Sequence, residues 1–280
     1  MHWLFHIYRY VRVLSIDVAL GAGIMAYFFG YYTQVTIPWV EYGILGLTVW
    51  LIYTADHLMD AYRITHTAHT YRHFFHQLYF ERILAVAAFI LVLTAWLTWM
   101  YLPLLTFRYG LLVSGLVLLH FGLAMIDRLQ HWFIFHKETR TALVYTLGVS
   151  LPAFSKSDTS LGALLLSAPF LQVFLVAYSN LLLISFFERS SDEEDNQVSL
   201  ARKLGEYRLT QLISIIFFLQ ACAILYGIWQ GVPLALLLLI GLMTVTLAVI
   251  LYYRRAFKYH ESYRALADAI FFYPCVLFWL

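Results

Sequence analysis

Two aspartates stand one helical turn apart at the end of a long apolar segment, in the stretch WLIYTADHLMDAYRI at residues 50–64. In a helix, the i, i+4 spacing of Asp56 and Asp60 places both side chains on one face, with Cβ atoms roughly 5–6 Å apart. Two like charges so placed repel each other unless a cation lies between them. Mg²⁺ suits that role, because it takes oxygen ligands and is commonly held by one or two carboxylates together with substrate phosphates. The segment indicates either a metal site or an ordinary solvated helix end.

A second acidic pair repeats the spacing. Glu188 and Asp192 are also i, i+4, in FFERSSDEEDNQVSLARKLG at residues 186–205. Two such pairs facing each other can hold two Mg²⁺ around one pyrophosphate, which favours a functional interpretation of both pairs. The three acids that follow, Glu193, Glu194 and Asp195, are expected to be solvated.

The chain that carries these pairs has the composition of a membrane protein. Its 280 residues are 62% hydrophobic and only 12% charged, whereas soluble domains carry about 25% charged residues. Apolar runs recur at the length that a helix needs to cross a bilayer, roughly 17–25 residues. We therefore predict an all-α polytopic membrane protein with about nine transmembrane helices in one domain, residues 1–280. The predicted spans are 13–31, 38–55, 83–102, 109–126, 140–155, 162–186, 209–229, 232–252 and 265–280.

The basic residues predict the orientation. Of the 18 Lys and Arg residues, all except Arg108 and Lys156 lie at or between alternate ends of the predicted spans. By the positive-inside rule, the side rich in basic residues faces the cytoplasm. We expect a cytoplasmic N-terminus, both acidic pairs on the cytoplasmic side, and a multi-pass location in an inner (cytoplasmic) membrane.

Other features narrow the classes of function. The net charge of +2 gives no indication of a nucleic-acid partner. Cys222 and Cys275 both fall inside predicted spans, so we expect packing residues rather than a disulfide or a metal pair. The start, MHWLFHIYRYVRVLS, lacks a small-residue cleavage site, so no removable signal peptide is expected.

The two acidic motifs and the topology resemble the UbiA superfamily of intramembrane prenyltransferases. That family has nine transmembrane helices and two Asp-rich motifs at cytoplasmic helix ends. YTADHLMD is similar to the first motif, NxxDxxxD, and ERSSDEEDNQVSLARKLG keeps the spacing of the second motif as far as Leu204 and Gly205. The chain departs from the family at Tyr53 (Asn in the family), Glu188 (Asp) and Asn196 (Gly).

Basic residues extend the resemblance to two more helices. HKETR, before TALVYTLGVSLP, is similar to the positively charged start of the family's fifth helix. Arg12, in YVRVLSIDVALGAG, stands where the family often has an Arg opening its first helix.

The resemblance implies the transfer of an isoprenyl group from a polyprenyl diphosphate to a lipophilic acceptor within the membrane. The implied catalytic and Mg²⁺-binding residues are Asp56, Asp60, Glu188 and Asp192. Basic side chains and metal stabilise the charge that develops on a leaving pyrophosphate, and aromatic rings can shelter the allylic cation that remains. The candidate substrate-binding residues are Arg12, Asp17, Arg63, Lys137, Arg140, Arg202 and Lys203, with Lys137 and Arg140 the first candidates for the pyrophosphate.

Two acids lie inside predicted spans, where charged groups usually face a cavity or a partner. Asp17 follows Arg12 by about a turn and a half, so an internal ion pair is one interpretation. The other is that Asp17 lines an acceptor pocket and takes a proton from the acceptor. Asp268 has no partner that the sequence identifies.

Four histidines in HTAHTYRHFFH, residues 66–76, fall on one stripe if the segment is helical: His66, His69, His73 and His76. Imidazole suits iron and zinc, so a metal-dependent membrane oxidoreductase with a histidine cluster is an alternative function. We favour an amphipathic interfacial helix whose histidines meet lipid headgroups.

A UbiA-like membrane protein that has lost its activity is a further alternative, because of Tyr53 and Glu188. A transporter is less favoured, because most prolines lie near predicted helix ends rather than at the midplane.

Overall fold

The computed structural model describes residues 9–64, 66–125, 127–195, 199–258 and 262–279, and the side chains of residues 124–136 lie outside the description. Every element that it describes is a helix, which confirms the predicted all-α class. The elements are α2 (Ile16–Thr33), α3 (Trp39–Arg63), α4 (Tyr71–Leu78), α5 (Phe80–Tyr101), α6 (Leu104–Met125), α7 (Asp127–Phe154), α8 (Leu161–Leu165), α9 (Ala168–Glu194), α10 (Leu200–Trp229), α11 (Leu234–Tyr252), α12 (Arg254–Phe257), α13 (Ser262–Ala269) and the 3₁₀ helix η2 (Ile270–Trp279).

Helices overlap each of the nine predicted spans in the described parts of the chain. Five of them are both long and apolar enough to cross a membrane: α5, α6 over Leu104–Leu123, α9, α10 and α11. The remaining spans correspond to α2, α3, α7 and α13 with η2. These contribute polar side chains to an internal cavity described below, which explains why they are less apolar than a helix that meets only lipid.

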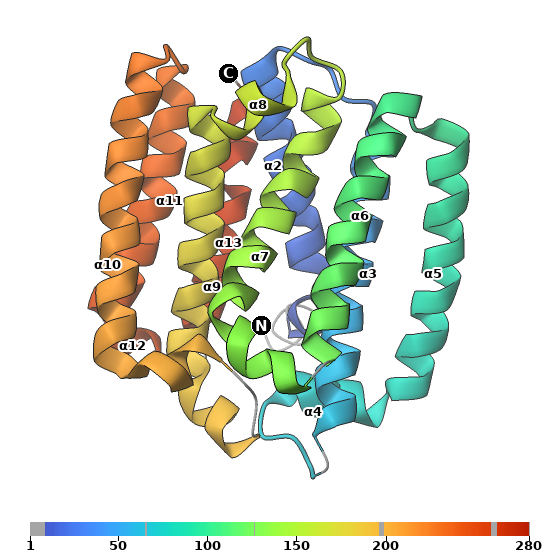
Figure 1. Ribbon diagram of the computed structural model, residues 1–280, viewed down its shortest axis with the longest axis vertical. Coiled ribbons are helices and arrows are strands. Elements are labelled where there is room, and N and C mark those ends of the chain that lie inside the picture. The colour runs from blue at the N-terminus through green and yellow to red at the C-terminus, as the bar shows by residue number, and fades with distance from the viewer. Residues whose placement is uncertain (1–8, 65, 126, 196–198, 259–261, 280) are drawn as a thin grey trace.

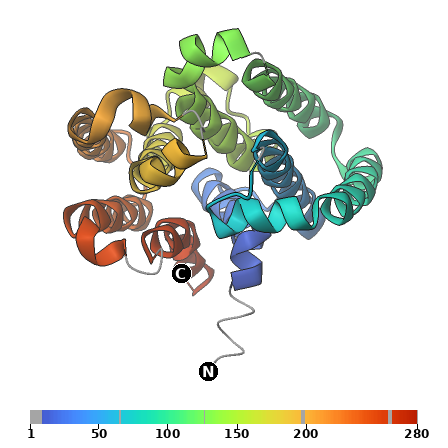
Figure 2. The same cartoon turned by 90° about the horizontal axis from the view of Figure 1, so that it is seen from below.

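The long helices run side by side, and their connections alternate between two ends of the molecule (Figure 1). The short helices α4 and α12 lie at one end, together with the last turns of α6 and α9 and the first turns of α7 and α10, whereas α8 lies at the other. The connections predicted to be cytoplasmic therefore share one end. Seen from that end, α2 lies among the other helices (Figure 2).

The core forms where α2 and α9 meet their neighbours. Met25, Phe28 and Phe29 of α2 and Leu182 and Leu183 of α9 are fully buried. In contrast, only 11% of the apolar window of α5 and 6% of that of α6 is buried. Their exposed leucines, valines and aromatics form the kind of surface that a lipid environment covers, because apolar patches of this extent are rare on soluble monomers.

Both acidic pairs lie within helices that run past the predicted spans. Helix α3 continues to Arg63 and α9 to Glu194, about two turns beyond the predicted ends at residues 55 and 186. After α9, the backbone of α10 breaks at Gly205, whose φ of 74° and ψ of 168° lie outside the helical region. An L-residue with a side chain rarely adopts that conformation. Gly205 thus sets the first turn of α10 at an angle to the rest of the helix.

The histidine segment differs from its prediction. Helix α4 begins only at Tyr71, with the Thr70 side chain accepting a hydrogen bond from the backbone N–H of His73 at 3.4 Å. The four histidines therefore do not share one helical stripe, because His66 and His69 precede the helix. His73 and His76 are buried, so the prediction that they meet lipid headgroups is wrong.

Candidate functional site

A cavity of about 1550 Å³ opens between the helices, with residues of α2, α3, α4, α5, α6, α7, α9 and α13 in its lining. Typical small-molecule pockets measure roughly 300–1,000 Å³, so this cavity has room for more than one ligand or for a long one. Its walls along α5 and α6 are largely apolar, and its end near the termini of α3 and α9 is charged.

All four predicted carboxylates line this one cavity. Asp56 and Asp60 project from the last turns of α3, and Glu188 and Asp192 from the last turns of α9. The two helices end at the same side of the molecule (Figure 1), and for that reason acids 132 residues apart in the chain (56 and 188) meet at one rim. The tertiary structure thus places both pairs in the lining of one cavity, although no three of these carboxylates bring oxygen atoms within 4.8 Å of one another in the described part of the chain.

The α3 pair faces a lysine. Lys137 of α7 lines the same cavity, and the carboxylates of Asp56 and Asp60 exert the strongest electrostatic attraction on its ammonium group. Arg72 and Arg63 also attract the carboxylate of Asp60. The α3 pair therefore lies among basic side chains from more than one helix.

The α9 pair is different, because Glu188 is already paired. Its Oε1 contacts Nη1 of Arg264 and accepts a hydrogen bond from the Tyr263 hydroxyl at 3.5 Å. Its Oε2 lies 3.7 Å from Nη2 of Arg72, and only 15% of the side chain is exposed. Sequence reasoning assigned Glu188 to metal alone, and it did not select Arg72 or Arg264, both of which line the cavity. Glu188 instead holds two guanidinium groups at the rim.

A fifth carboxylate near the rim was also missed. Glu138 is buried, lines the cavity and accepts a hydrogen bond from the backbone N–H of Leu200 at 3.2 Å. It thereby satisfies one of the free N–H groups at the start of α10. The basic motif HKETR contains this residue directly after Lys137, but nothing in the motif shows that it faces inward.

The predicted substrate-binding residues divide into two groups. Arg12, Asp17 and Lys137 line the cavity. The other four predicted residues do not line the cavity. One of them, Arg202, donates a hydrogen bond to the backbone oxygen of Asp192 at 3.4 Å. The four residues outside the described lining are Arg63, Arg140, Arg202 and Lys203.

The two intramembrane acids lie together. Asp17 and Asp268 border a small side pocket of about 30 Å³, together with Tyr53, Tyr145 and Asn180. The Asn180 side chain hydrogen-bonds the Asp268 carboxyl, which gives Asp268 the partner that the sequence did not identify. Both acids also line the main cavity, and this arrangement agrees with the interpretation that Asp17 faces a ligand pocket.

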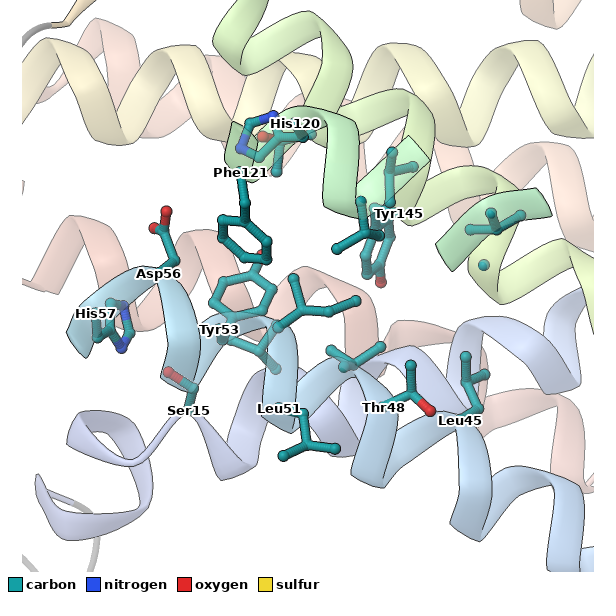
Figure 3. A pocket seen from close by; sticks show the side chains of 18 of the residues that line it. Ser15, Leu45, Thr48, Leu51, Tyr53, Asp56, His57, His120, Phe121 and Tyr145 are labelled. Atoms are coloured by element: carbon teal, nitrogen blue, oxygen red, sulfur yellow. The ribbon is translucent and has the colours of Figure 1, made fainter. Parts of the chain in front are cut away.

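Aromatic side chains form part of the wall between the charged rim and the apolar interior. Tyr53 of α3, Phe121 of α6 and Tyr145 of α7 project toward the same space (Figure 3). Tyr53 occupies the position for which the resemblance expects Asn, and its ring makes an edge contact with His57 at 6.3 Å between centroids. An amide would offer a polar group here, whereas the tyrosine offers an aromatic face.

Asp195 is buried, which contradicts its predicted solvation. Burial alone would raise the pKa of its carboxyl, but hydrogen bonds from His69 and His66 outweigh burial and hold that pKa below its ordinary value. The hydrogen bond to Asp195 in turn raises the pKa of His69. Burial lowers the pKa of nearby His73 to about 3, so its ring is neutral at physiological pH.

Taken together, the apolar helices and the partly charged cavity are those of a membrane protein with a large cavity inside its helix bundle. The fold is similar to the apo structure of a UbiA homolog from Aeropyrum pernix K1, with a TM-score of 0.65 over 95% of this chain and 99% of that chain. The predicted UbiA-like fold is thus confirmed. The two sequences are 12% identical, so the similarity shows the fold alone. No family model and no curated protein matches the sequence.

Proposed function

We propose that this protein is a membrane prenyltransferase that moves a prenyl group from a prenyl diphosphate to a lipophilic acceptor. The observation that carries the proposal is the convergence of Asp56, Asp60, Glu188 and Asp192 with basic side chains at one end of a single, otherwise apolar cavity. A prenyl diphosphate has the same division, with a charged head and a long apolar chain.

The basic groups at the rim suit the diphosphate. Lys137, Arg72 and Arg264 all line the charged end of the cavity. Fixed positive charges in a partly enclosed site stabilise negative charge that develops on a leaving group. Glu188 holds both arginines in place through its ion pairs, so we assign it a positioning role rather than a direct contact with substrate.

The remaining acids suit Mg²⁺. Asp56, Asp60 and Asp192 line the cavity and supply carboxylate oxygens, the ligands that Mg²⁺ prefers, and Mg²⁺ is commonly held by one or two carboxylates together with substrate phosphates. When bound, Mg²⁺ neutralises phosphate oxygens and acts as a Lewis acid. We propose these three carboxylates as its protein ligands.

The cavity beyond the rim suits the prenyl chain and the reacting carbon. Apolar residues of α5 and α6, among them Leu91, Leu111 and Val117, line the deeper part. The rings of Tyr53 and Phe121 stand between that part and the rim, where they can face an allylic cation.

The proposed reaction is a nucleophilic substitution at the allylic carbon. The allylic C–O bond breaks and its electron pair leaves with pyrophosphate, the acceptor's nucleophilic atom bonds to the allylic carbon, and the acceptor loses a proton. Among the carboxyl groups of the lining, we propose that Asp17 or Asp268 takes this proton.

A binding protein that has lost the reaction is the second candidate. It is favoured by the ion pairs of Glu188, which occupy a carboxylate that the resemblance assigns to the metal.

The test uses the purified full chain in detergent with Mg²⁺, a series of prenyl diphosphates, and a membrane lipid extract as the source of acceptor. Prenyl transfer should appear as pyrophosphate release that requires both Mg²⁺ and the extract. Binding of a non-hydrolysable prenyl diphosphate analogue is measured in parallel. Mg²⁺-dependent binding without pyrophosphate release supports the second candidate, and an absence of Mg²⁺-dependent binding overturns both.

A further inference from the structure

A second cluster of metal-binding side chains lies outside the cavity lining. His66 and His69, in the connection between α3 and α4, meet Asp195, the residue that ends α9. Oδ1 of Asp195 lies 3.2 Å from Nε2 of His66 and 2.6 Å from Nδ1 of His69. One ligand atom from each of the three residues lies within 4.8 Å of the other two. Two segments more than 120 residues apart are thus joined by groups that commonly bind divalent metals.

His73 provides a second, independent observation. It is only 4% exposed, and within the described residues neither ring nitrogen has a hydrogen-bond partner. Its Nδ1 lies 3.9 Å from Oδ2 of Asp195, an oxygen that is also buried without a hydrogen-bond partner. Leaving such groups unsatisfied is unfavourable, because burial removes the hydrogen bonds that water would otherwise supply. A ligand that accepts both lone pairs removes that cost.

We propose that His66, His69, His73 and Asp195 form a binding site for Zn²⁺. Zinc is commonly four-coordinate and tetrahedral, with His nitrogen and Asp oxygen ligands at roughly 2.0–2.2 Å. Those bond lengths place neighbouring ligand atoms about 3.3 Å apart. The distances from Oδ1 of Asp195 to His69 and His66, 2.6 and 3.2 Å, lie below that value. His73, 3.9 Å from Oδ2, lies outside the group that meets within 4.8 Å and must move toward it to become the fourth ligand.

The surroundings of the cluster allow a metal ion to enter from solvent. The side chains of His66 and His69 are 42% and 48% exposed, which leaves a route for the ion, whereas the Asp195 side chain is 1% exposed and fixed in place. Three neutral imidazoles and one carboxylate leave a single net positive charge on a Zn²⁺ complex, beside the exposed carboxylate of Glu194.

The site also reaches the proposed catalytic rim. On the ring edge away from Asp195, Nε2 of His73 lies 3.9 Å from Oδ2 of Asp60. Metal-bound histidines usually donate their other ring N–H to a carboxylate, and this contact orients both partners. Zinc at His73, which itself lines the cavity, would therefore position Asp60 from the edge of the rim.

The test is zinc binding to the full chain in detergent after removal of metal by a chelator, with competition against a zinc-sensitive dye. Wild type should bind one Zn²⁺ per chain, and Co²⁺ in its place should give the absorption bands of a tetrahedral site. Because losing a residue behind a ligand already weakens metal binding roughly 10- to 100-fold, His69→Ala and Asp195→Asn should each weaken it at least about 100-fold. The matched controls Thr67→Ala and Glu193→Gln, at exposed neighbouring positions, should change it less than about twofold.

A further variant separates loss of a ligand from misfolding. In His69→Cys the thiolate can replace the imidazole as a ligand, so this variant should retain zinc binding that His69→Ala loses. The proposal is overturned if wild type binds no stoichiometric zinc, or if His69→Ala binds it as tightly as wild type. It is also overturned if zinc binding is lost in Asp56→Asn but kept in Asp195→Asn, which would assign the metal to the cavity rim. None of these measurements requires prenyl transfer, so their outcome is independent of the proposed activity.

Discussion

The ends of α3 and α9 carry acidic pairs with the same spacing, yet the two pairs have different partners. At the end of α3, Asp56 and Asp60 share the attraction of one lysine from α7. At the end of α9, Glu188 is bound by Arg72 and Arg264, which come from α4 and α13. One carboxylate of the second pair is thus held by two arginines, whereas both carboxylates of the first pair act on the same lysine.

The difference shows that spacing alone does not make a carboxylate available to a metal. The i, i+4 rule places two side chains on one face of a helix, but residues from other helices decide what that face meets. Mutations at the two ends should therefore have different kinds of effect: on ligand binding and activity at α3, and on stability as well at α9.

The largest effect is expected at the α3 end. Asp56→Asn removes a proposed Mg²⁺ ligand and should lower the rate of prenyl transfer about 100- to 1000-fold, the range seen when one electrostatic contact to a developing charge is lost. The unfolding free energy of this variant in detergent should change by less than about 1 kcal/mol, because Asp60 still faces Lys137. Pyrophosphate release and thermal unfolding measure the two quantities. Activity within tenfold of wild type would remove Asp56 from the proposed site.

Glu188→Gln should have a larger effect on stability, and a smaller effect on ligand binding and activity, than Asp56→Asn. It leaves Arg72 and Arg264 without their shared carboxylate in a largely buried place, and we expect a loss of about 2 kcal/mol in unfolding free energy. Affinity for the diphosphate analogue should fall about tenfold, because the arginines lose their fixed positions. Unchanged thermal stability combined with complete loss of Mg²⁺-dependent binding would instead indicate that Glu188 is a metal ligand. Glu188→Asp, which keeps the charge on a shorter side chain, is the matched control and should lose less stability.

Lys137→Gln tests the counter-charge of the α3 pair. Without the ammonium group, Asp56 and Asp60 repel each other and the diphosphate loses one positive contact, so affinity for the analogue should fall about tenfold. Titration of the analogue at several Mg²⁺ concentrations measures this change. An analogue affinity equal to that of wild type at every Mg²⁺ concentration would show that Lys137 does not face the diphosphate.

The smallest effect is expected for basic residues near the second motif but outside the cavity lining. Arg202→Gln and Lys203→Gln remove exposed charges, and each should change analogue affinity less than about twofold at physiological salt, where exposed charges are screened. The same titration serves for both. A loss comparable to that of Lys137→Gln would mean that the start of α10 moves toward the ligand when it binds.

Parts of the site could be predicted because they depend on local periodicity. The pairing of Asp56 with Asp60 and of Glu188 with Asp192 follows from 3.6 residues per turn, and the apolar runs between them mark the helices. The sequence could not identify Arg72, Arg264 or Glu138 as neighbours of these acids, because these residues lie on α4, α13 and α7 rather than on α3 or α9. The predicted helix over residues 66–76 was wrong in its first part, because Thr70 caps the helix and α4 begins only at Tyr71.

Composition and periodicity alone determined the all-α membrane class, the approximate spans and the face on which each acidic pair lies, because these depend on hydrophobicity and on the geometry of a single helix. Only the tertiary structure decided that the pairs share one cavity, that Glu188 is bound by arginines, and that Asp195 meets two histidines. These contacts join residues distant in the chain, and the packing of α3, α4, α7, α9 and α13 sets which of them meet.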